Sequence, residues 1–233
     1  MSNIRLTEKL HIIKNNIYKI PTNESFVSLF SGGKDSALAL SIALETGNAI
    51  ALIHYLDEDT DESIFHKQKR AIIEAQAKAL GIPVIYQYRN WWARWNKLVK
   101  LYMDFKKRGV KYVVFGDLDA NDNVKNQITL CRSAGLIPCL PLLKSPYDVL
   151  LNEIHERGIK CVISAIDSRL VDGSWLGKVF DRKAYEYFTE IGIDPFGENG
   201  EYHTTLVDAD CFKHPLKYTI STKKEDSIII DLM

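Results

Sequence analysis

The segment FVSLFSGGKDSALAL, which runs from Phe26 to Leu40, carries the strongest structural signal in the chain. Its first five residues are largely apolar, which predicts a buried strand. A serine and two glycines follow, and the apolar run after them has no helix breaker until Gly47, which predicts a helix. A strand, a tight turn and a helix in this order present backbone N–H groups at the positive end of the helix, where anions bind.

The residues of this turn suit a polyphosphate with its Mg²⁺ ion. Glycines let a phosphate approach the main chain, serines and a lysine supply donors, and an aspartate can hold Mg²⁺ against the phosphate oxygens. In chain order they are Ser31, Gly32, Gly33, Lys34, Asp35 and Ser36. The turn is not a Walker A loop, which needs Gly, four residues and then Gly-Lys-Ser/Thr. The alternative is an ordinary strand-to-helix turn with a serine cap, which needs neither the Lys-Asp pair nor the two serines.

Composition places the chain among ordinary globular proteins. Of its 233 residues, 46% are hydrophobic and 26% are charged, enough for a sizeable core without disulfides or metal. Lys+Arg and Asp+Glu both number 30, so the formal net charge is zero and nothing attracts the whole molecule to nucleic acid or an anionic membrane. The four cysteines form no zinc-type spacing, and there is no apolar run of about 18 residues that could span a membrane. We expect a cytoplasmic protein with buried, reduced thiols.

Strands and helices alternate along the first half of the chain, which predicts an α/β fold with a doubly wound, mainly parallel, Rossmann-like sheet. The predicted strands cover residues 26–30, 49–55, 84–88 and 111–115. Ligands of such sheets bind beyond the carboxyl ends of the strands. The turn at 31–36, the end of the second strand near His54 and Tyr55, and Gly116-Asp117 after the fourth strand should therefore meet in one crevice. Asp117 becomes a second candidate ligand of Mg²⁺, with a turn or helix cap as its alternative role.

Three parts are expected along the chain. Residues 1–20 form an N-terminal helical extension, because Leu6, Leu10, Ile13 and Ile17 recur at helical spacing. Residues 21–117 form the nucleotide-binding domain. Residues 118–233 form a smaller α/β part that shapes the substrate site, with helices near 124–133, 147–157 and 181–191, a strand at 160–165 and short β-prone pieces at the end.

A long helix is predicted between the third and fourth strands, with an aromatic face. Trp91, Trp95, Tyr102 and Phe105 recur along it at helical spacing. The stripe could stack a base, but a core-facing role is the simpler interpretation.

Two glutamates flank a predicted turn in the second part. Glu198 and Glu201 surround Asn199-Gly200, a turn-forming pair that can direct both carboxylates into one pocket. Such a pair could hold Mg²⁺, bind ammonium or act as a base on ammonia. Neighbouring candidates are His203, a possible proton acceptor, and Thr204. A polar hairpin loop is the alternative.

The motifs resemble those of a known family. Ser31-Gly-Gly-Lys-Asp-Ser36 resembles the PP-loop of the N-type ATP pyrophosphatases, which cleave ATP between the α- and β-phosphates. The resemblance narrows to the diphthine–ammonia ligase (diphthamide synthetase) family through further motifs in family order. They are Val114-Phe-Gly116-Asp117, Cys131-x-x-x-Gly135-Leu136, Pro141-Leu-Leu143, Leu176-Gly-Lys178 and Gly197-Glu-Asn-Gly-Glu-Tyr-His-Thr204.

The resemblance implies an ATP- and Mg²⁺-dependent amide-forming ligase. A carboxylate is adenylated, pyrophosphate leaves, and ammonia displaces AMP. In the family the acceptor is diphthine on translation elongation factor two. The sequence departs from the family at His203 (usually Glu), Asn199 (usually Gly) and Leu143 (usually Trp), a pattern similar to a bacterial side branch.

The acceptor is therefore open: a protein side chain or a small metabolite such as a cobalamin-related acid. Two other classes remain as alternatives, a tRNA-modifying PP-loop enzyme and a non-catalytic nucleotide sensor. The paired cysteines of sulfur-transferring relatives are absent, and zero net charge makes nucleic acid an unexpected partner. A homodimer is a further possibility.

Overall fold

The computed structural model describes residues 16–63, 68–88 and 94–233. Residues 1–15 of the predicted N-terminal helical extension lie outside this range. Residues 16–20 are described and are not helical, because Ile17 forms an isolated parallel bridge with Cys139 instead. Trp91 of the predicted aromatic face also lies outside it.

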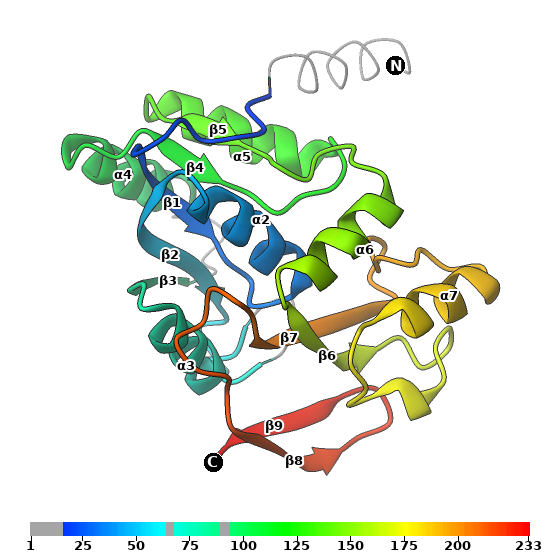
Figure 1. Ribbon diagram of the computed structural model, residues 1–233. Coiled ribbons are helices and arrows are strands. Elements are labelled where there is room, and N and C mark those ends of the chain that lie inside the picture. Colours follow the sequence, from blue (N-terminus) through cyan, green and yellow to red (C-terminus); the bar gives the residue numbers. More distant parts are fainter. Residues whose placement is uncertain (1–15, 64–67, 89–93) are drawn as a thin grey trace.

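A five-stranded parallel sheet forms the centre of the molecule (Figure 1). Its order is β3-β2-β1-β4-β5, so the strand that precedes the predicted phosphate-binding turn lies in the middle. The strands are β1 (Ser25–Leu29), β2 (Asn48–Leu56), β3 (Val84–Tyr88), β4 (Tyr112–Val114) and β5 (Ile137–Cys139). This arrangement confirms the predicted α/β fold.

Helices cover both faces of this sheet, as the continuous apolar strands require. The core of one face receives α2 (Lys34–Leu44) and α3 (Arg70–Leu80), and that of the other receives α4 (Arg94–Lys107) and α5 (Asp122–Ser133). Side chains of β1 alternate between the two cores: Phe26 enters the first and Val27 the second. Tyr102 and Phe105 of α4 are buried in the second core, so this part of the predicted aromatic face packs inside the protein.

The fifth strand was not predicted, because Pro138 and Pro141 interrupt its apolar segment. Val113 of β4 pairs with Pro138 in a parallel register. Proline cannot donate to a ladder, and it is tolerated here because β5 lies at the end of the sheet order. The central sheet thus extends beyond Asp117, to Cys139.

The second part of the chain builds two antiparallel pairs. They comprise β6 (Lys160–Ile166) with β7 (Tyr202–Asp208), and β8 (Tyr218–Lys223) with β9 (Ile228–Leu232). A bridge between Ala165 and Ser227 links the pairs. The helical elements of this part are α6 (Tyr147–Glu156), the short 3₁₀ helix η1 (Gly173–Trp175) and α7 (Arg182–Glu190).

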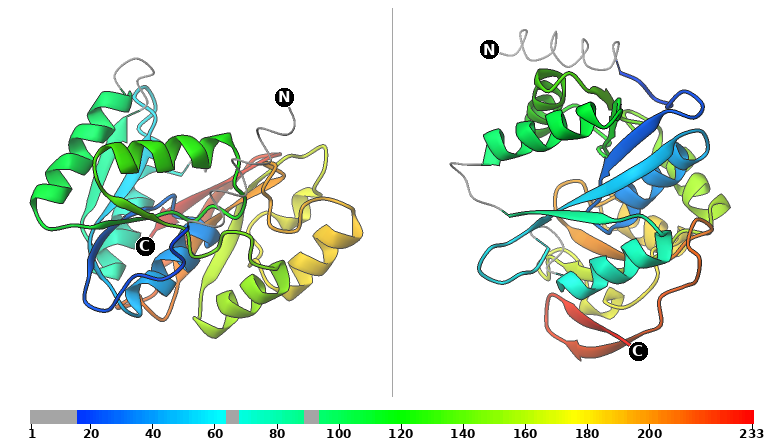
Figure 2. Two further views of the ribbon diagram at one scale, coloured as in Figure 1. Left: turned by 90° about the horizontal axis from the view of Figure 1, so that it is seen from above. Right: turned by 90° about the vertical axis from the view of Figure 1, so that its left-hand side faces the viewer.

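Helix α2 joins the two parts, since it contacts β4 of the central sheet as well as β7 and α6. Figure 2 shows α2 lying between the central sheet and the strands of the second part. The first turn of α2 therefore faces residues from both halves of the chain.

Three of the four cysteines, Cys131, Cys139 and Cys161, are buried free thiols, and Cys211 is half-buried. Within the described ranges, no helix is both long and apolar enough to cross a membrane.

Candidate functional site

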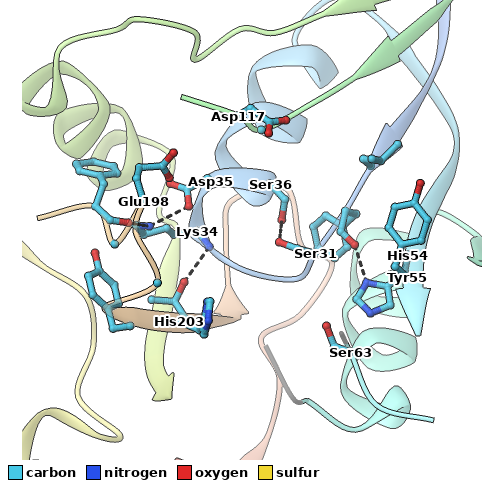
Figure 3. A pocket seen from close by; sticks show the side chains of 18 of the residues that line it. Ser31, Lys34, Asp35, Ser36, His54, Tyr55, Ser63, Asp117, Glu198 and His203 are labelled. Atoms are coloured by element: carbon cyan, nitrogen blue, oxygen red, sulfur yellow. Dashed lines mark hydrogen bonds and ion pairs between the residues drawn. The ribbon is translucent and has the colours of Figure 1, made fainter. Parts of the chain in front are cut away.

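A pocket of about 490 Å³ opens at the carboxyl ends of β1, β2 and β4. The turn after β1 (residues 31–36, called the PP-loop below) forms its floor, and residues 196–204 close the opposite side (Figure 3). The predicted site residues that line it are Ser31, Lys34, Asp35, Ser36, His54, Gly116, Asp117, Glu198, Asn199, Gly200, His203 and Thr204. Gly32, Gly33 and Glu201, which the sequence also predicted, do not line it.

The PP-loop is held in shape by hydrogen bonds between its own residues. The Ser31 hydroxyl donates to Ser36 Oγ over 3.1 Å, and the Ser36 hydroxyl donates to the Gly33 carbonyl over 3.0 Å. Gly32 has φ +86°, the left-handed region that glycine favours, whereas Gly33 is extended. Only one of the two glycines thus adopts a positive φ.

A buried glutamine fastens this loop to the second half of the chain. The carbonyl of Gly32 accepts from the backbone N–H of Leu206 (2.8 Å) and from Nε2 of Gln76 (3.1 Å). The same Nε2 also donates to the Leu206 carbonyl over 2.8 Å. Gln76 is fully buried, and a Cβ atom on Gly32 would lie only 2.6 Å from its Oε1. Sequence reasoning missed Gln76; its one signal is a polar residue on the helix face that Ile72 marks as apolar.

Three carboxylates gather at the pocket, from three separate segments. Burial raises the pKa of Asp117 to about 6, and the nearby charge of Asp35 adds to this shift. Burial likewise raises the pKa of Glu198 to about 7, again with repulsion from Asp35 and a smaller contribution from Asp117. Burial also raises the pKa of Asp35, although Lys34 opposes the shift. The negative charges thus disfavour one another's ionisation, although in the described part of the chain no three His, Cys, Asp or Glu side chains are grouped closely enough to hold a metal ion.

Asp35 and Asp117 fit a Mg²⁺ site. Asp35 Oδ1 is buried and has no hydrogen-bond partner in the described part of the chain. Oxygen ligands of hard character and a surplus of negative charge are what Mg²⁺ requires, with phosphate oxygens completing its shell.

Gly116 lets the end of β4 pack directly on the first turn of α2. A Cβ atom at this position would lie 2.9 Å from the carbonyl of Asp35 and 2.9 Å from the backbone nitrogen of Ser36. Such distances are too short for a methyl group. The absence of a side chain at Gly116 therefore sets how closely Asp117 approaches Asp35.

Lys34 does not extend freely into the pocket. Its ammonium donates to the Phe196 carbonyl and, over 2.8 Å, to Asp35 Oδ2. The rings of Phe180, Phe196 and Tyr202 surround it at 5.2 to 5.5 Å. Only 4% of Lys34 is exposed.

The two predicted glutamates have opposite environments. Residues 194–201 form a loop, called the carboxylate loop below. The carboxylate of Glu201 accepts from the backbone N–H of Asp194 (3.2 Å) and from both the N–H and the side-chain amide of Asn199 (3.0 Å each). Burial opposes ionisation of Glu201, but these hydrogen bonds lower its pKa below the usual value. Glu201 thus closes the loop, and Glu198 faces the pocket (Figure 3).

The end of the pocket near β2 is mostly uncharged. His54 donates from Nδ1 to the Phe30 carbonyl over 2.7 Å, and its Nε2 is buried without a partner in the described ranges. Burial lowers the pKa of His54 to about 4, so the ring is neutral at physiological pH and Nε2 carries a lone pair. Ser63 and Gln127 line the pocket as well, and sequence reasoning missed both. The one sequence signal that could have indicated Gln127 is its position on α5, the helix that follows Asp117.

Two family models match most of the chain. The model of the diphthamide synthase N-terminal domain matches residues 25–138, and that of the diphthamide synthase C-terminal domain matches residues 146–229. The comparison with curated proteins finds no match.

Two solved structures are similar to this chain. A "predicted subunit of tRNA methyltransferase" from Methanocaldococcus jannaschii is 18% identical, with a TM-score of 0.41, and the match covers 83% of this chain and 100% of that one. The U34-tRNA thiolase NcsA from Methanococcus maripaludis is 13% identical, with a TM-score of 0.38, over 65% of this chain and 62% of that one. The two family models together span most of the sequence, and the chain belongs to the diphthamide synthase family of ATP-using PP-loop enzymes.

Proposed function

We propose that this protein is an ATP-dependent ligase that adenylates a carboxylate and converts it to an amide with ammonia, forming AMP and pyrophosphate. The observation that carries the proposal is the pocket itself, in which the PP-loop, Asp117 and Glu198 face one another. A site that only bound nucleotide would need the first of these and not a third carboxylate on the opposite wall.

The nucleotide is proposed to lie with its phosphates over the PP-loop and its adenosine toward His54. The N–H groups of α2 that follow Lys34 would donate to phosphate oxygens, and so would the hydroxyls of Ser31 and Ser36 in exchange for their bonds within the loop. The neutral end of the pocket, with the lone pair of His54 Nε2, suits the adenine amino group, which is a donor.

The first step joins the acceptor to the nucleotide. An oxygen of the acceptor carboxylate attacks the α-phosphorus, the bond to the β-phosphate oxygen breaks, and pyrophosphate leaves. Asp35 and Asp117 would hold Mg²⁺, which supplies positive charge to the phosphate oxygens as negative charge builds up. The pocket would bring the two reactants together, and such proximity contributes several kcal/mol to catalysis, about 7–11 in the best cases.

The second step forms the amide. Ammonia attacks the acyl carbon of the adenylate, the bond to the AMP oxygen breaks, and the nitrogen loses a proton. Glu198 is the proposed base, because its carboxylate lines the pocket and receives no hydrogen bond from the described residues. Its pKa of about 7 suits proton transfer near neutral pH. His203 and Thr204 stand beside it on the same wall.

The acceptor is proposed to enter from the side of the carboxylate loop. The second part of the chain, residues 118–233 in the division predicted from sequence, would shape its binding. Family membership favours a diphthine-like protein side chain, and the departures at Asn199, His203 and Leu143 favour a small acid, such as a cobalamin-related one.

The test is to identify which ATP bond breaks. The protein is incubated with Mg²⁺, ammonium chloride and ATP labelled at the α-phosphate, with a panel of carboxylic acids or a filtered metabolite extract. We expect labelled AMP and pyrophosphate only when an acceptor acid is present. Formation of ADP, or AMP release that no acid stimulates, would contradict the proposal.

A further inference from the structure

One residue of the PP-loop, Lys34, donates hydrogen bonds to the opposite wall on both sides of Glu198. The backbone N–H of Lys34 donates to Thr204 Oγ1 over 3.0 Å, beyond the end of that loop. The ammonium of the same residue donates to the carbonyl of Phe196, before Glu198. Figure 3 shows both bonds leaving Lys34 toward the wall that carries Glu198 and His203.

The ammonium of Lys34 is held by contacts within the protein. Two of its three donors are used by Phe196 and Asp35, and three aromatic rings surround it. Moving it onto a phosphate would break these contacts and leave the buried Phe196 carbonyl without a donor. The position therefore favours a fixed role in the protein over a contact with substrate.

The carboxylate loop has other bonds, but they lie within the second half of the chain: the Tyr147 hydroxyl donates to Asp194 Oδ2 over 2.9 Å, and the Asp167 N–H donates to the Glu201 carbonyl over 2.8 Å. Glu201 and Asp194 tie the loop to itself, through the N–H groups of Asn199 and Phe196. These bonds give the loop a shape but do not place it over the PP-loop. The bonds to Lys34 link it to the first turn of α2.

We propose that Lys34 is a positioning residue, which clamps the carboxylate loop onto the PP-loop through Phe196 and Thr204 and so sets the place of Glu198, without binding phosphate. The role of Glu198 as a base rests on the proposed function. The clamp, which is the pair of bonds from Lys34 to Phe196 and Thr204, does not depend on it.

The experiment measures loop order and nucleotide affinity separately. Hydrogen exchange of the amides of residues 196–200 is followed by NMR, and binding of Mg²⁺ with α,β-methylene-ATP by calorimetry. In Lys34→Met, whose side chain still fills the aromatic cage, we expect loop exchange to rise about tenfold. Nucleotide affinity should fall far less than in Ser36→Ala, which removes a proposed phosphate donor.

Two further variants make the test specific. Thr204→Val removes the acceptor of the Lys34 N–H but keeps the ammonium, and it should also raise loop exchange; it carries the test if Lys34→Met does not fold. Lys178→Met is the control. It removes an ammonium that lies 4.3 Å from the centre of an aromatic ring, that of Trp175, in the second half of the chain. It should change neither loop exchange nor nucleotide affinity.

Unchanged loop exchange in both Lys34→Met and Thr204→Val would overturn the proposal. A loss of nucleotide affinity in Lys34→Met equal to that in Ser36→Ala would overturn it as well, whatever the exchange shows. If the wild-type protein does not bind the nucleotide, the proposed function fails, while exchange without nucleotide still decides the clamp.

Discussion

The PP-loop and the carboxylate loop face each other across one pocket but are stabilised in opposite ways. The PP-loop is tied by serine hydroxyls within six residues of sequence and needs one left-handed glycine. The carboxylate loop is closed by a charged side chain, Glu201, and is docked by Lys34 from the other end of the chain. The PP-loop thus takes its shape from uncharged side chains, whereas the carboxylate loop takes its shape from a buried charge and its place over the pocket from a residue 162 positions away.

This contrast separates binding from chemistry. Variants in the PP-loop should act on the nucleotide and its metal directly. Variants in the carboxylate loop should act on the second reactant or on stability. The following predictions test that division, beginning with the largest expected effect.

Asp35→Asn should reduce acceptor-dependent pyrophosphate release by about 10²–10³-fold, because the substitution removes an electrostatic group of the proposed metal site. The fold should be retained. Asp148→Asn is the matched control, since Asp148 also stands in the first turn of a helix, α6, and is exposed there. Normal turnover in a folded Asp35→Asn protein would show that the metal is held elsewhere.

Glu198→Gln should slow amide formation by about 10²-fold, the lower range for loss of a general base. Affinity for Mg²⁺ with α,β-methylene-ATP should change little, because Glu198 acts after the nucleotide is bound. Both quantities are measured on the same preparation. An equal fall in both would make Glu198 a nucleotide or metal ligand, and the division between the loops would fail.

Glu201→Gln should lower the free energy of unfolding by about 2 kcal/mol, because a charged acceptor of three hydrogen bonds is replaced by a neutral one. The pKa of Glu201 is lower in the folded protein than its ordinary value of 4.5. Its stabilisation is therefore present above pH 4.5 and is lost as the pH falls through the folded value. Urea unfolding should show a difference between variant and wild type at pH 7 that shrinks in acid; a difference independent of pH would contradict this role.

His54→Asn should weaken nucleotide binding by about threefold to tenfold, the effect of one lost hydrogen bond. Asparagine can still donate to the carbonyl of Phe30, the residue just before the PP-loop, so the backbone there should keep its conformation. His54→Leu is the comparison, because it loses that donor as well and should also lower stability. If His54→Asn binds nucleotide normally, the neutral end of the pocket does not recognise the base through this side chain.

Sequence patterns predicted one of the two loops far better than the other. The strand, turn and helix around Ser31 and Ser36 follow from local rules, and local hydrogen bonds indeed maintain them. The direction of the Lys34 side chain could not be predicted, because its partner Phe196 lies 162 residues away. The partner of the Lys34 backbone N–H, Thr204, is equally remote, at 170 residues. For the same reason the spacing of Glu198 and Glu201 could not show that one faces the pocket and the other closes a turn.

The central sheet shows a similar limit. Its first four strands could be predicted from apolar runs in the sequence. Strand β5 could not, because it contains Pro138, which is tolerated only at the edge of the sheet. The role of Gln76 could not be predicted, because it depends on the two carbonyls to which this side chain donates. They belong to Gly32 and Leu206 and come close to Gln76 only in the folded protein.

The bonds that join Lys34 to Thr204 and Gly32 to Leu206 also set an order of events during synthesis. The PP-loop is made early, but its partners leave the ribosome about 170 residues later. At about 5–20 residues per second this delay is roughly 10–30 s. Through this interval the strand, turn and helix exist without the strand that receives them, so a nascent chain has the motif but not the finished site. The two contacts make completion of the pocket one of the last steps of folding and keep an incomplete chain from presenting a working centre.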